Sequence, residues 1–385
     1  NRIEADARRP KAPKLFRHGI MERTKLWEKF GFNTQWNIRD ASRNRLRSLM
    51  AIVGVFGCTA LVVCAFGMND SMEGLKVWQY EKVNLYESRL TLSETATREQ
   101  IDNIIAAVHG EAILEDSVEI RANGVKKAGT FLVTDNVTLI KPTGMKMEYV
   151  TLPTDGISIT SKMAELLEVK RGDSIEWHIY GTEGWTTSKI AAVYREPVNQ
   201  GITMTRQQFE SLGMKFKPSA IISAETVTTN MDGVDSVLST ADSIAGWDTL
   251  TEAMYILVYV LILAATILSV VVLYNLGLLS FTEMEREMAT LKVMGLKTRR
   301  LRGLLLTQNL WFSAIGFILG VPGGLWLIDV ITSFSGEAFE FPIMLRFLTL
   351  LISFVFTFGL SVLVNLLFSR KIRRLNMVES LKALE

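Results

Sequence analysis

The sequence predicts an integral membrane protein, in which a four-transmembrane-helix bundle has a large extracytoplasmic α+β domain inserted between its first and second helices. Two observations predict this fold class. The 385 residues are 48% hydrophobic and 21% charged, with a mean hydropathy of +0.22, and the apolar residues are concentrated in four long blocks. Basic residues flank these blocks, while acidic residues dominate a long insert between the first two. This division argues against a single soluble globule and against a disordered chain.

Four apolar segments have the length of membrane spans. A helix rises about 1.5 Å per residue, so about 20 apolar residues cross a hydrocarbon core of roughly 30 Å. Buried helices of a soluble protein are the alternative, but four such helices with almost no charge would be unusual. Arg346 lies near one end of the fourth segment, where its side chain can reach the interface. The predicted spans are residues 49–68, 253–280, 303–331 and 343–368.

The charges beside the spans predict the orientation. Residues 1–48 have a net charge of +8, residues 281–302 and 369–385 have +3 each, and residues 69–252 have −10. Positively charged flanks remain on the cytoplasmic side. We therefore expect a multi-pass protein of a bacterial cytoplasmic membrane with both termini in the cytoplasm. The insert and the short loop 332–342 are then outside.

The insert, residues 69–252, has the pattern of a folded mixed domain that is long enough to have its own core. A capping-box pattern at Thr97 and Gln100 predicts one helix, and a similar start at Thr205, closed by Gly213, predicts another. The first span is expected to continue outward as a helix. Further patterns predict a short helix at residues 161–167 and strands at residues 117–121, 129–134, 173–180 and 188–194.

The chain has no recognisable catalytic, metal or cofactor motif. It lacks the P-loop of an ATPase, the H-E-x-x-H of a zinc protease and the G-x-S-x-G of a hydrolase. The three histidines are far apart, and Cys58 and Cys64 are six residues apart on one helix, so they cannot bridge each other. The net charge of +2 argues against a generally basic nucleic-acid binder. We expect no catalytic residue, no resident metal or cofactor, and no nucleic-acid partner.

A basic amphipathic stretch, residues 35–49, comes directly before the first span. Its apolar residues can lie in the membrane interface while its arginines face lipid headgroups. Ordinary positive flanking charge explains the same residues equally well. The candidate interfacial residues are Trp36, Arg39, Arg43 and Arg47, with membrane lipids as their partner.

Small residues three or four apart line one face of the third span. Such a face allows another helix to approach closely, although the pattern does not identify that helix. The candidate packing residues are Ser313, Gly316, Gly320 and Gly324.

A cytoplasmic segment, residues 281–302, follows the second span and is expected to continue it as a helix. Met284, Met288 and Leu291 form an apolar stripe beside Glu283 and Glu287, and Gly295 suits a left-handed cap. A short exposed helix with an apolar stripe needs a partner that buries it. An external protein is favoured over the protein's own N-terminal segment.

The order of these parts resembles the FtsX/MacB-like permeases of ABC transporters. The segment Glu283-Met-Glu-Arg-Glu-Met-Ala-Thr-Leu-Lys-Val-Met-Gly295 is similar to the family's E-R-x-x-E-[IM]-A-x-L-x-x-[ML]-G signature. The tail Met377-Val-Glu-Ser-Leu-Lys382 resembles the family's P-x-E-[AS]-L-[KR] ending, with a departure at the proline. The stretch Leu166–Ile175 followed by Lys189–Arg195 resembles the small outer β subdomain, and Arg9–Lys14 resembles the linker between the halves of long, duplicated members. The last similarity implies the C-terminal half of a larger permease.

This resemblance implies a mechanism. A separate ATPase dimer binds and hydrolyses ATP, contacts the cytoplasmic helix, and drives motion that passes to the outside domain for export or extraction of a peptide, lipid or lipoprotein. A second four-helix unit, supplied by the other half or a second copy, completes the symmetry, and an extracytoplasmic protein or peptide is a further candidate partner. The alternative is an FtsX-like regulator of an extracytoplasmic cell-wall hydrolase. The expected ATPase contacts are Glu283, Glu287, Met288, Leu291, Met294 and Gly295.

Overall fold

The computed structural model describes residues 31–43, 45–135, 138–229, 231–293, 298–334 and 336–373. The chain divides into two compact units, which are considered separately. One unit comprises the described parts of residues 1–60, 264–323 and 352–385. The other comprises the described parts of residues 61–263 and 324–351.

Among the described residues, four helices are long and apolar enough to cross a membrane. They are α3 (Arg45–Val77), α7 (Thr240–Val293), α8 (Thr298–Ser333) and α9 (Phe347–Arg373), and α2 (Phe32–Arg43) precedes them. Half of the apolar window of α3 is buried, compared with 17% for α7, 22% for α8 and 28% for α9. The helix α3 is therefore the most enclosed of the four.

The first unit contains a close contact between α3 and α8. A Cβ atom at Gly320 would lie 2.5 Å from Cβ of Thr59, and one at Gly316 would lie 2.6 Å from Cγ1 of Val55. Both distances are shorter than real side chains allow, so only glycine fits at this helix contact. The helix α3 also meets α7 and α9 at this level, because Val55 belongs to a buried cluster with Leu273 and Val364.

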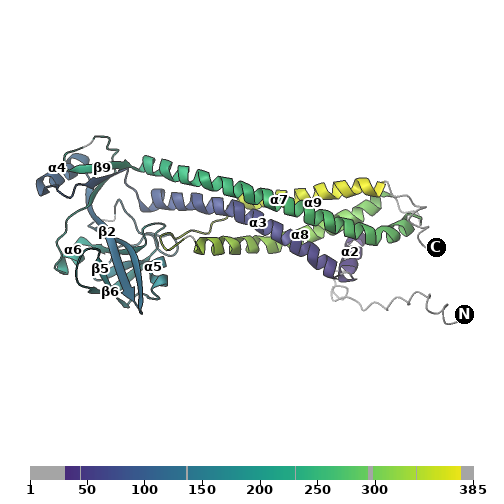
Figure 1. The fold of residues 1–385 in the computed structure, drawn as a ribbon, viewed down its shortest axis with the longest axis horizontal. Coiled ribbons are helices and arrows are strands. Elements are labelled where there is room, and N and C mark those ends of the chain that lie inside the picture. Colours follow the sequence, from purple (N-terminus) through teal and green to yellow (C-terminus); the bar gives the residue numbers. More distant parts are fainter. Residues whose placement is uncertain are drawn as a thin grey trace. The chain divides into compact units, whose positions relative to one another are not determined.

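The second unit contains a sheet domain (Figure 1). In the described residues it is built from nine strands in the order β3-β7-β4-β6-β5-β2-β8-β1-β9. The strands are β1 (Ser88–Leu92), β2 (Glu111–Ala122), β3 (Val125–Thr134), β4 (Ile157–Thr160), β5 (Ser174–Ile179), β6 (Thr186–Tyr194), β7 (Gly201–Thr205), β8 (Ala220–Ser223) and β9 (Val234–Ser239). Three short helices accompany them: α4 (Arg98–Val108), α5 (Ser161–Leu166) and α6 (Arg206–Ser211).

Six of these strands form a closed ring. Because β3 pairs with β2 as well as with β7, the strands β3, β7, β4, β6, β5 and β2 return to their starting point. The core inside the ring is apolar and includes Phe131 and Trp177, whose ring centroids are 4.9 Å apart. The helix α5 packs against β4 and β6, and α6 packs against β3 and β7. We call this ring the barrel.

The rest of the domain is an open sheet that extends from the same β2 strand. Glu111–Ile113 of β2 pairs with β8, and β8 leads to β1 and β9. Leu90 of β1 and Ile101 and Ile104 of α4 belong to a second buried cluster. The apolar face of α4 covers this sheet, which is why the helix is amphipathic.

Several local predictions from the sequence are confirmed. The capping box at Thr97 and Gln100 starts α4, and the Thr205 hydroxyl accepts from the Gln208 backbone N–H at the start of α6. The strands predicted at residues 173–180 and 188–194 form the antiparallel hairpin of β5 and β6. The helix that continues the first span is not α-helical throughout. The helix α3 ends at Val77 and is followed by a π-helical turn, η3 (Trp78–Val83).

The basic stretch before the first span also differs from the expected single amphipathic segment. It belongs to two helices, α2 up to Arg43 and α3 from Arg45, so Leu46 and Leu49 lie on α3. In α2 the most buried side chains are polar, Asn37 and Asp40. Asp40 is buried because it accepts a hydrogen bond from the Gln308 amide of α8 at 2.8 Å.

Candidate functional site at the stalk

The two helices that enter the sheet domain are connected to neighbouring strands. The helix α3 leads through η3 to β1, and β9 leads directly into α7. The strands β1 and β9 are antiparallel partners, with Ser88 opposite Ser239. The Thr240 backbone N–H donates to the Glu87 carbonyl at 2.9 Å, which joins the two chain segments just where the helices meet the sheet. We call residues 69–83 and 240–252 the stalk.

A local cap determines where α7 begins. The Ser239 hydroxyl accepts from the Asp242 backbone N–H at 2.9 Å and donates to the Asp242 carboxylate at 2.6 Å. The carboxylate also lies in the first turn, where it is favoured by the helix dipole. The helix therefore starts within residues 69–252, which the sequence assigned to the outer domain, and runs unbroken into the second span.

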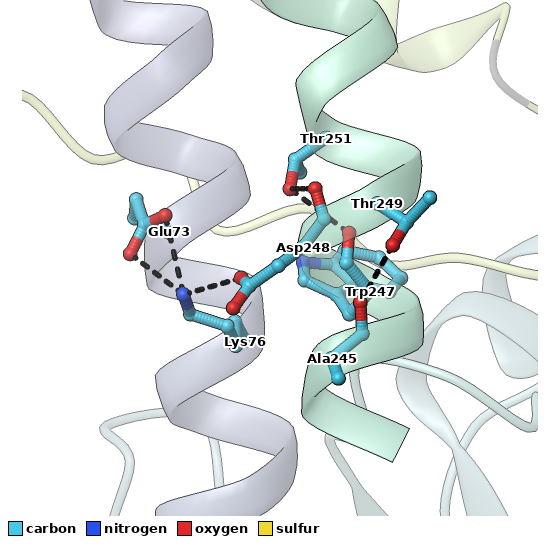
Figure 2. Close-up of polar contacts among 7 residues, drawn as sticks. All are labelled: Glu73, Lys76, Ala245, Trp247, Asp248, Thr249 and Thr251. Atoms are coloured by element: carbon cyan, nitrogen blue, oxygen red, sulfur yellow. Dashed lines mark hydrogen bonds and ion pairs between the residues drawn. The ribbon is translucent and has the colours of Figure 1, made fainter. Parts of the chain in front are cut away.

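An ion-pair cluster links the two helices of the stalk. Figure 2 shows Lys76 of α3 between Glu73 of the same helix and Asp248 of α7. The ammonium Nζ lies 2.9 Å from Oδ1 of Asp248 and 3.3 Å from the Glu73 carboxylate. The side chain of Lys76 is 21% exposed, while that of Asp248 is 54% exposed. A pair with one such exposed partner contributes at most about 1 kcal/mol, so it sets the alignment of the helices more than their stability.

The predicted first span would leave this cluster outside the hydrocarbon. The candidate span Ser48–Val83, which includes η3, has 36 residues, about 54 Å at 1.5 Å per residue, whereas the hydrocarbon core is about 30 Å thick. With the span at residues 49–68, Lys76 is about 12 Å beyond its end. On that prediction, the charged cluster is in contact with water and not with lipid tails.

The π-helical turn connects the stalk to the barrel. The indole N–H of Trp78 donates to the Thr143 hydroxyl at 2.9 Å, and that hydroxyl donates to the Arg195 carbonyl at 2.7 Å. The guanidinium carbon of Arg195 lies 5.0 Å from the Trp78 ring centroid. The Trp78 side chain is only 1% exposed. The end of α3 is thus fixed to the segment that follows β6.

A buried carboxyl group lies next to this contact. Glu196 lines a small cavity with Tyr86, Glu115 and Thr203, and burial raises its pKa to about 8, helped slightly by the charge of Glu115. Burial likewise raises the pKa of Tyr86 to about 12 and that of Tyr194 well above its usual range. Glu196 is therefore mostly neutral at pH 7, which is how an acid can occupy the interior beside Tyr194.

Four of the six candidate ATPase contacts lie on α7. Glu283, Glu287, Met288 and Leu291 belong to the helical backbone of α7, which extends to Val293. Met294 and Gly295 lie outside the described residues. The expected role of these residues therefore stays a prediction.

The candidate packing residues of the third span are all on α8. Gly316 and Gly320 lie against α3, as described above. Ser313 contacts another helix, because its hydroxyl donates to Ser361 of α9 at 2.8 Å. Gly324 is buried, and its neighbour Gly323, which the sequence pattern did not include, lies against Phe56.

The candidate interfacial residues are on α2 and α3. Arg39 and Arg43 are exposed and Trp36 is half-buried. Arg43 lies 3.4 Å from Asp40, the residue that also binds Gln308. Arg47 belongs to the helical backbone of α3. Sequence reasoning missed Asp40, although an acid within a basic stretch is a signal that could have identified it.

The described residues contain no group of three His, Cys, Asp or Glu side chains that could hold a metal. His178 lies 2.8 Å from the Glu119 carboxylate, and the Lys126 and His178 hydrogen bonds lower the pKa of that carboxyl. Cys58 and Cys64 are buried and unbridged. Glu115 pairs with Arg89 at 2.9 Å. His178, Glu119 and Glu115 thus have structural partners within the sheet domain.

The comparison with protein families identifies the membrane part of the chain. Residues 259–377 match the family model described as FtsX-like permease C-terminal. The chain carries an FtsX-like permease domain. A comparison with curated proteins finds no match. The match spans α7 from residue 259 through α9 and leaves the sheet domain uncovered.

The FtsX-like permease domain supports a coarse assignment of function. Such permeases are membrane components of the ABC-transporter type, and they are generally not catalytic themselves. They are typically found in complexes with an ATPase. Together with the four apolar helices, the match indicates a multi-pass membrane protein.

Proposed function

We propose that the chain is the permease subunit, or half, of an ABC transporter of MacB-like architecture in the bacterial cytoplasmic membrane, with both termini cytoplasmic. A separate ATPase dimer hydrolyses ATP, and its motion passes through the spans to the outer domain. This movement exports a peptide, lipid or lipoprotein, or extracts it from the outer face of the membrane. A second four-helix unit, which is the other half of a duplicated protein or a second copy, completes the transporter.

The continuity of the stalk is the observation that most supports this proposal. The helices α3 and α7 run without a break from the apolar spans to the sheet domain, and they end at paired strands β1 and β9. Because α7 is one continuous helix from Thr240 to Val293, an unbroken backbone connects its cytoplasmic end to β9. The contacts at Lys76 and Trp78 hold the outer end of α3 to the same structure.

Charge reversal in the cytoplasmic end of α7 tests the coupling to the ATPase. In the proposed complex Glu283 and Glu287 face the ATPase, so Glu283→Lys with Glu287→Lys should remove the stimulation of ATP hydrolysis by the permease. Reconstituted proteoliposomes containing the adjacent ATPase would report the hydrolysis rate. We expect the stimulated part of the hydrolysis rate to fall at least about tenfold, a factor that corresponds to roughly 1.4 kcal/mol.

A matched variant distinguishes coupling from general charge effects. Glu176→Lys reverses an exposed charge on the barrel, and it should leave both membrane insertion and ATPase stimulation unchanged. If the double variant at Glu283 and Glu287 stimulates the ATPase as well as the unchanged protein does, these residues are not the contact.

A second candidate function, which the resemblance of the sequence to FtsX-like permeases implies, is regulation of an extracytoplasmic cell-wall hydrolase. In that case the outer domain binds a protein, and nothing crosses the membrane. Hydrolase activity measured with the full chain in nanodiscs would separate the two functions. ATP-dependent activation of a hydrolase, without release of peptide or lipid from the membrane, favours regulation.

A further inference from the structure

The loop between α8 and α9 is attached at both of its ends to other parts of the second unit. We call residues 336–346 the strap. Its C-terminal part contacts the outer end of α3, and its N-terminal part contacts the barrel. Because the strap is bound at both of its ends, the two separate sets of contacts indicate a specific conformation.

The contacts with α3 hold the start of α9. The Arg346 backbone N–H donates to the Asp70 carboxylate at 2.9 Å, and the Met344 N–H donates to the Ser71 hydroxyl at 3.3 Å. Asp70 is only 4% exposed, and it satisfies an N–H next to the first turn of α9, as an N-cap would. A Cβ atom at Gly74 would lie 2.7 Å from Sδ of Met344, so the strap also packs closely on α3.

The contacts with the barrel use charged side chains. Arg195 Nε donates to Oε1 of Glu340 at 2.5 Å, and their side chains are only 21% and 15% exposed. The Glu340 backbone N–H also donates to the Pro197 carbonyl at 3.0 Å. Glu337 forms an ion pair with Lys127 of β3. Glu340 thus makes both a side-chain bond and a main-chain bond to the barrel, and together they fix the position of the strap there.

Arg195 connects the strap to the stalk. The same guanidinium that binds Glu340 lies over the ring of Trp78 at the end of α3. The barrel segment at Arg195 is thus fixed from two directions, by η3 and by the strap. Detachment of the strap breaks the Arg195–Glu340 ion pair together with the Glu340–Pro197 main-chain bond, so more than one contact favours the bound position.

We propose that the strap is a clasp that fixes the barrel against the outer end of α3, with the Arg195–Glu340 ion pair as its closing contact. The clasp gives the fourth span a direct connection to the barrel, in addition to the stalk. This inference concerns how the outer domain is held, and it applies whether or not the chain moves a substrate.

Cross-linking between strap and barrel tests the proposal. Lys127→Cys and Glu337→Cys place two thiols at a neighbouring strap contact, in full-length protein that also carries Cys58→Ala and Cys64→Ala. A short bifunctional thiol reagent added to this protein in nanodiscs reports how often the strap is closed. Glu340→Gln or Arg195→Ala should slow cross-linking at least fivefold. The charge swap Arg195→Glu with Glu340→Arg should restore at least half of the rate.

The barrel offers a matched control. Arg121 Nε and Glu176 Oε2 form a similar pair at 2.6 Å on β2 and β5, with no strap residue in the contact. Glu176→Gln should leave the cross-linking rate unchanged. The clasp is refuted if the rate is also unchanged in Glu340→Gln and Arg195→Ala. If both slow the reaction but the charge swap restores nothing, the ion pair is not the closing contact.

Discussion

At the scale of single residues, the segment after β6 combines three roles in adjacent positions. Arg195 points to the strap and Trp78, Glu196 lines the internal cavity, and the Pro197 carbonyl accepts from the strap. Successive side chains of an extended chain point in alternating directions, and this produces the arrangement. The charge states of neighbouring residues differ. Arg195 forms an ion pair with Glu340. Glu196 is largely neutral, because no cationic group is among those that influence its pKa.

Glu196 should make stability depend on pH. Its pKa is about 8 in the folded protein against an ordinary value of 4.5. The folded state therefore holds the proton more tightly, and the stabilising effect of protonation is lost as the pH rises through this window. The slope is about 1.4 kcal/mol per pH unit. Glu196→Gln should flatten the profile, because the amide cannot ionise. Thermal unfolding between pH 5 and pH 9 measures this difference.

The exposed residue Glu183 provides the control for this prediction, and Glu183→Gln should unfold with the pH profile of the unchanged protein. The expected gain for Glu196→Gln is largest at pH 9 and disappears near pH 5. If Glu196→Gln and the unchanged protein gave parallel pH profiles over the whole range, Glu196 would be ionised or solvated in the folded state.

At the scale of elements, burial explains why β4, β7 and β8 were not predicted from the sequence, whereas β5 and β6 were. The strands β5 and β6 were predicted from their alternation and their hairpin turn, and the polar side of each remains partly exposed. All four positions are buried in β4 and in β8, and all but the last in β7. Such strands have no polar face and no alternation to detect. Their positions depend on the barrel and on the sheet beside it, which only the folded domain provides.

The contact between α3 and α8 should be sensitive to side-chain size. Gly320→Leu forces a side chain into space already occupied by Thr59, and such overpacking costs about 1–3 kcal/mol. We expect a lower midpoint of thermal unfolding in detergent. Gly359 on α9 is exposed, with nothing within 4 Å of a Cβ atom, so Gly359→Leu should unfold like the unchanged protein. Equal midpoints for both variants would contradict the close helix contact.

At the scale of the whole molecule, the net charge of +2 is the sum of strongly positive segments and a strongly negative insert. The apolar helices separate these two groups of charge along the chain. Positive flanks resist translocation, which predicts the side of the membrane for each segment. The acidic insert coincides with the sheet domain, β1 to β9, and with the outer ends of α3 and α7.

Cysteine labelling tests this orientation. In protein that lacks Cys58 and Cys64, Glu183→Cys places an exposed thiol on the hairpin of the barrel, and Ser42→Cys places one at the end of α2. A membrane-impermeant maleimide added to spheroplasts should label position 183 and leave position 42 unlabelled until the membrane is opened. The reverse labelling pattern would invert the topology.

The sequence by itself determined the four spans, the insert, the charge polarity and the local caps at Thr97 and Thr205, because each depends on neighbouring residues or on composition. The family match supports the permease assignment that the motif at Glu283–Gly295 suggested. Tertiary structure alone decided the closure of the barrel, the burial of Asp40 against Gln308 and the strap contact of Arg195 with Glu340. These features join residues 145 to 268 positions apart or pair strands across the domain. No local pattern encodes such pairings, since an arginine or a glutamate on a surface looks the same in sequence whether or not its partner lies opposite.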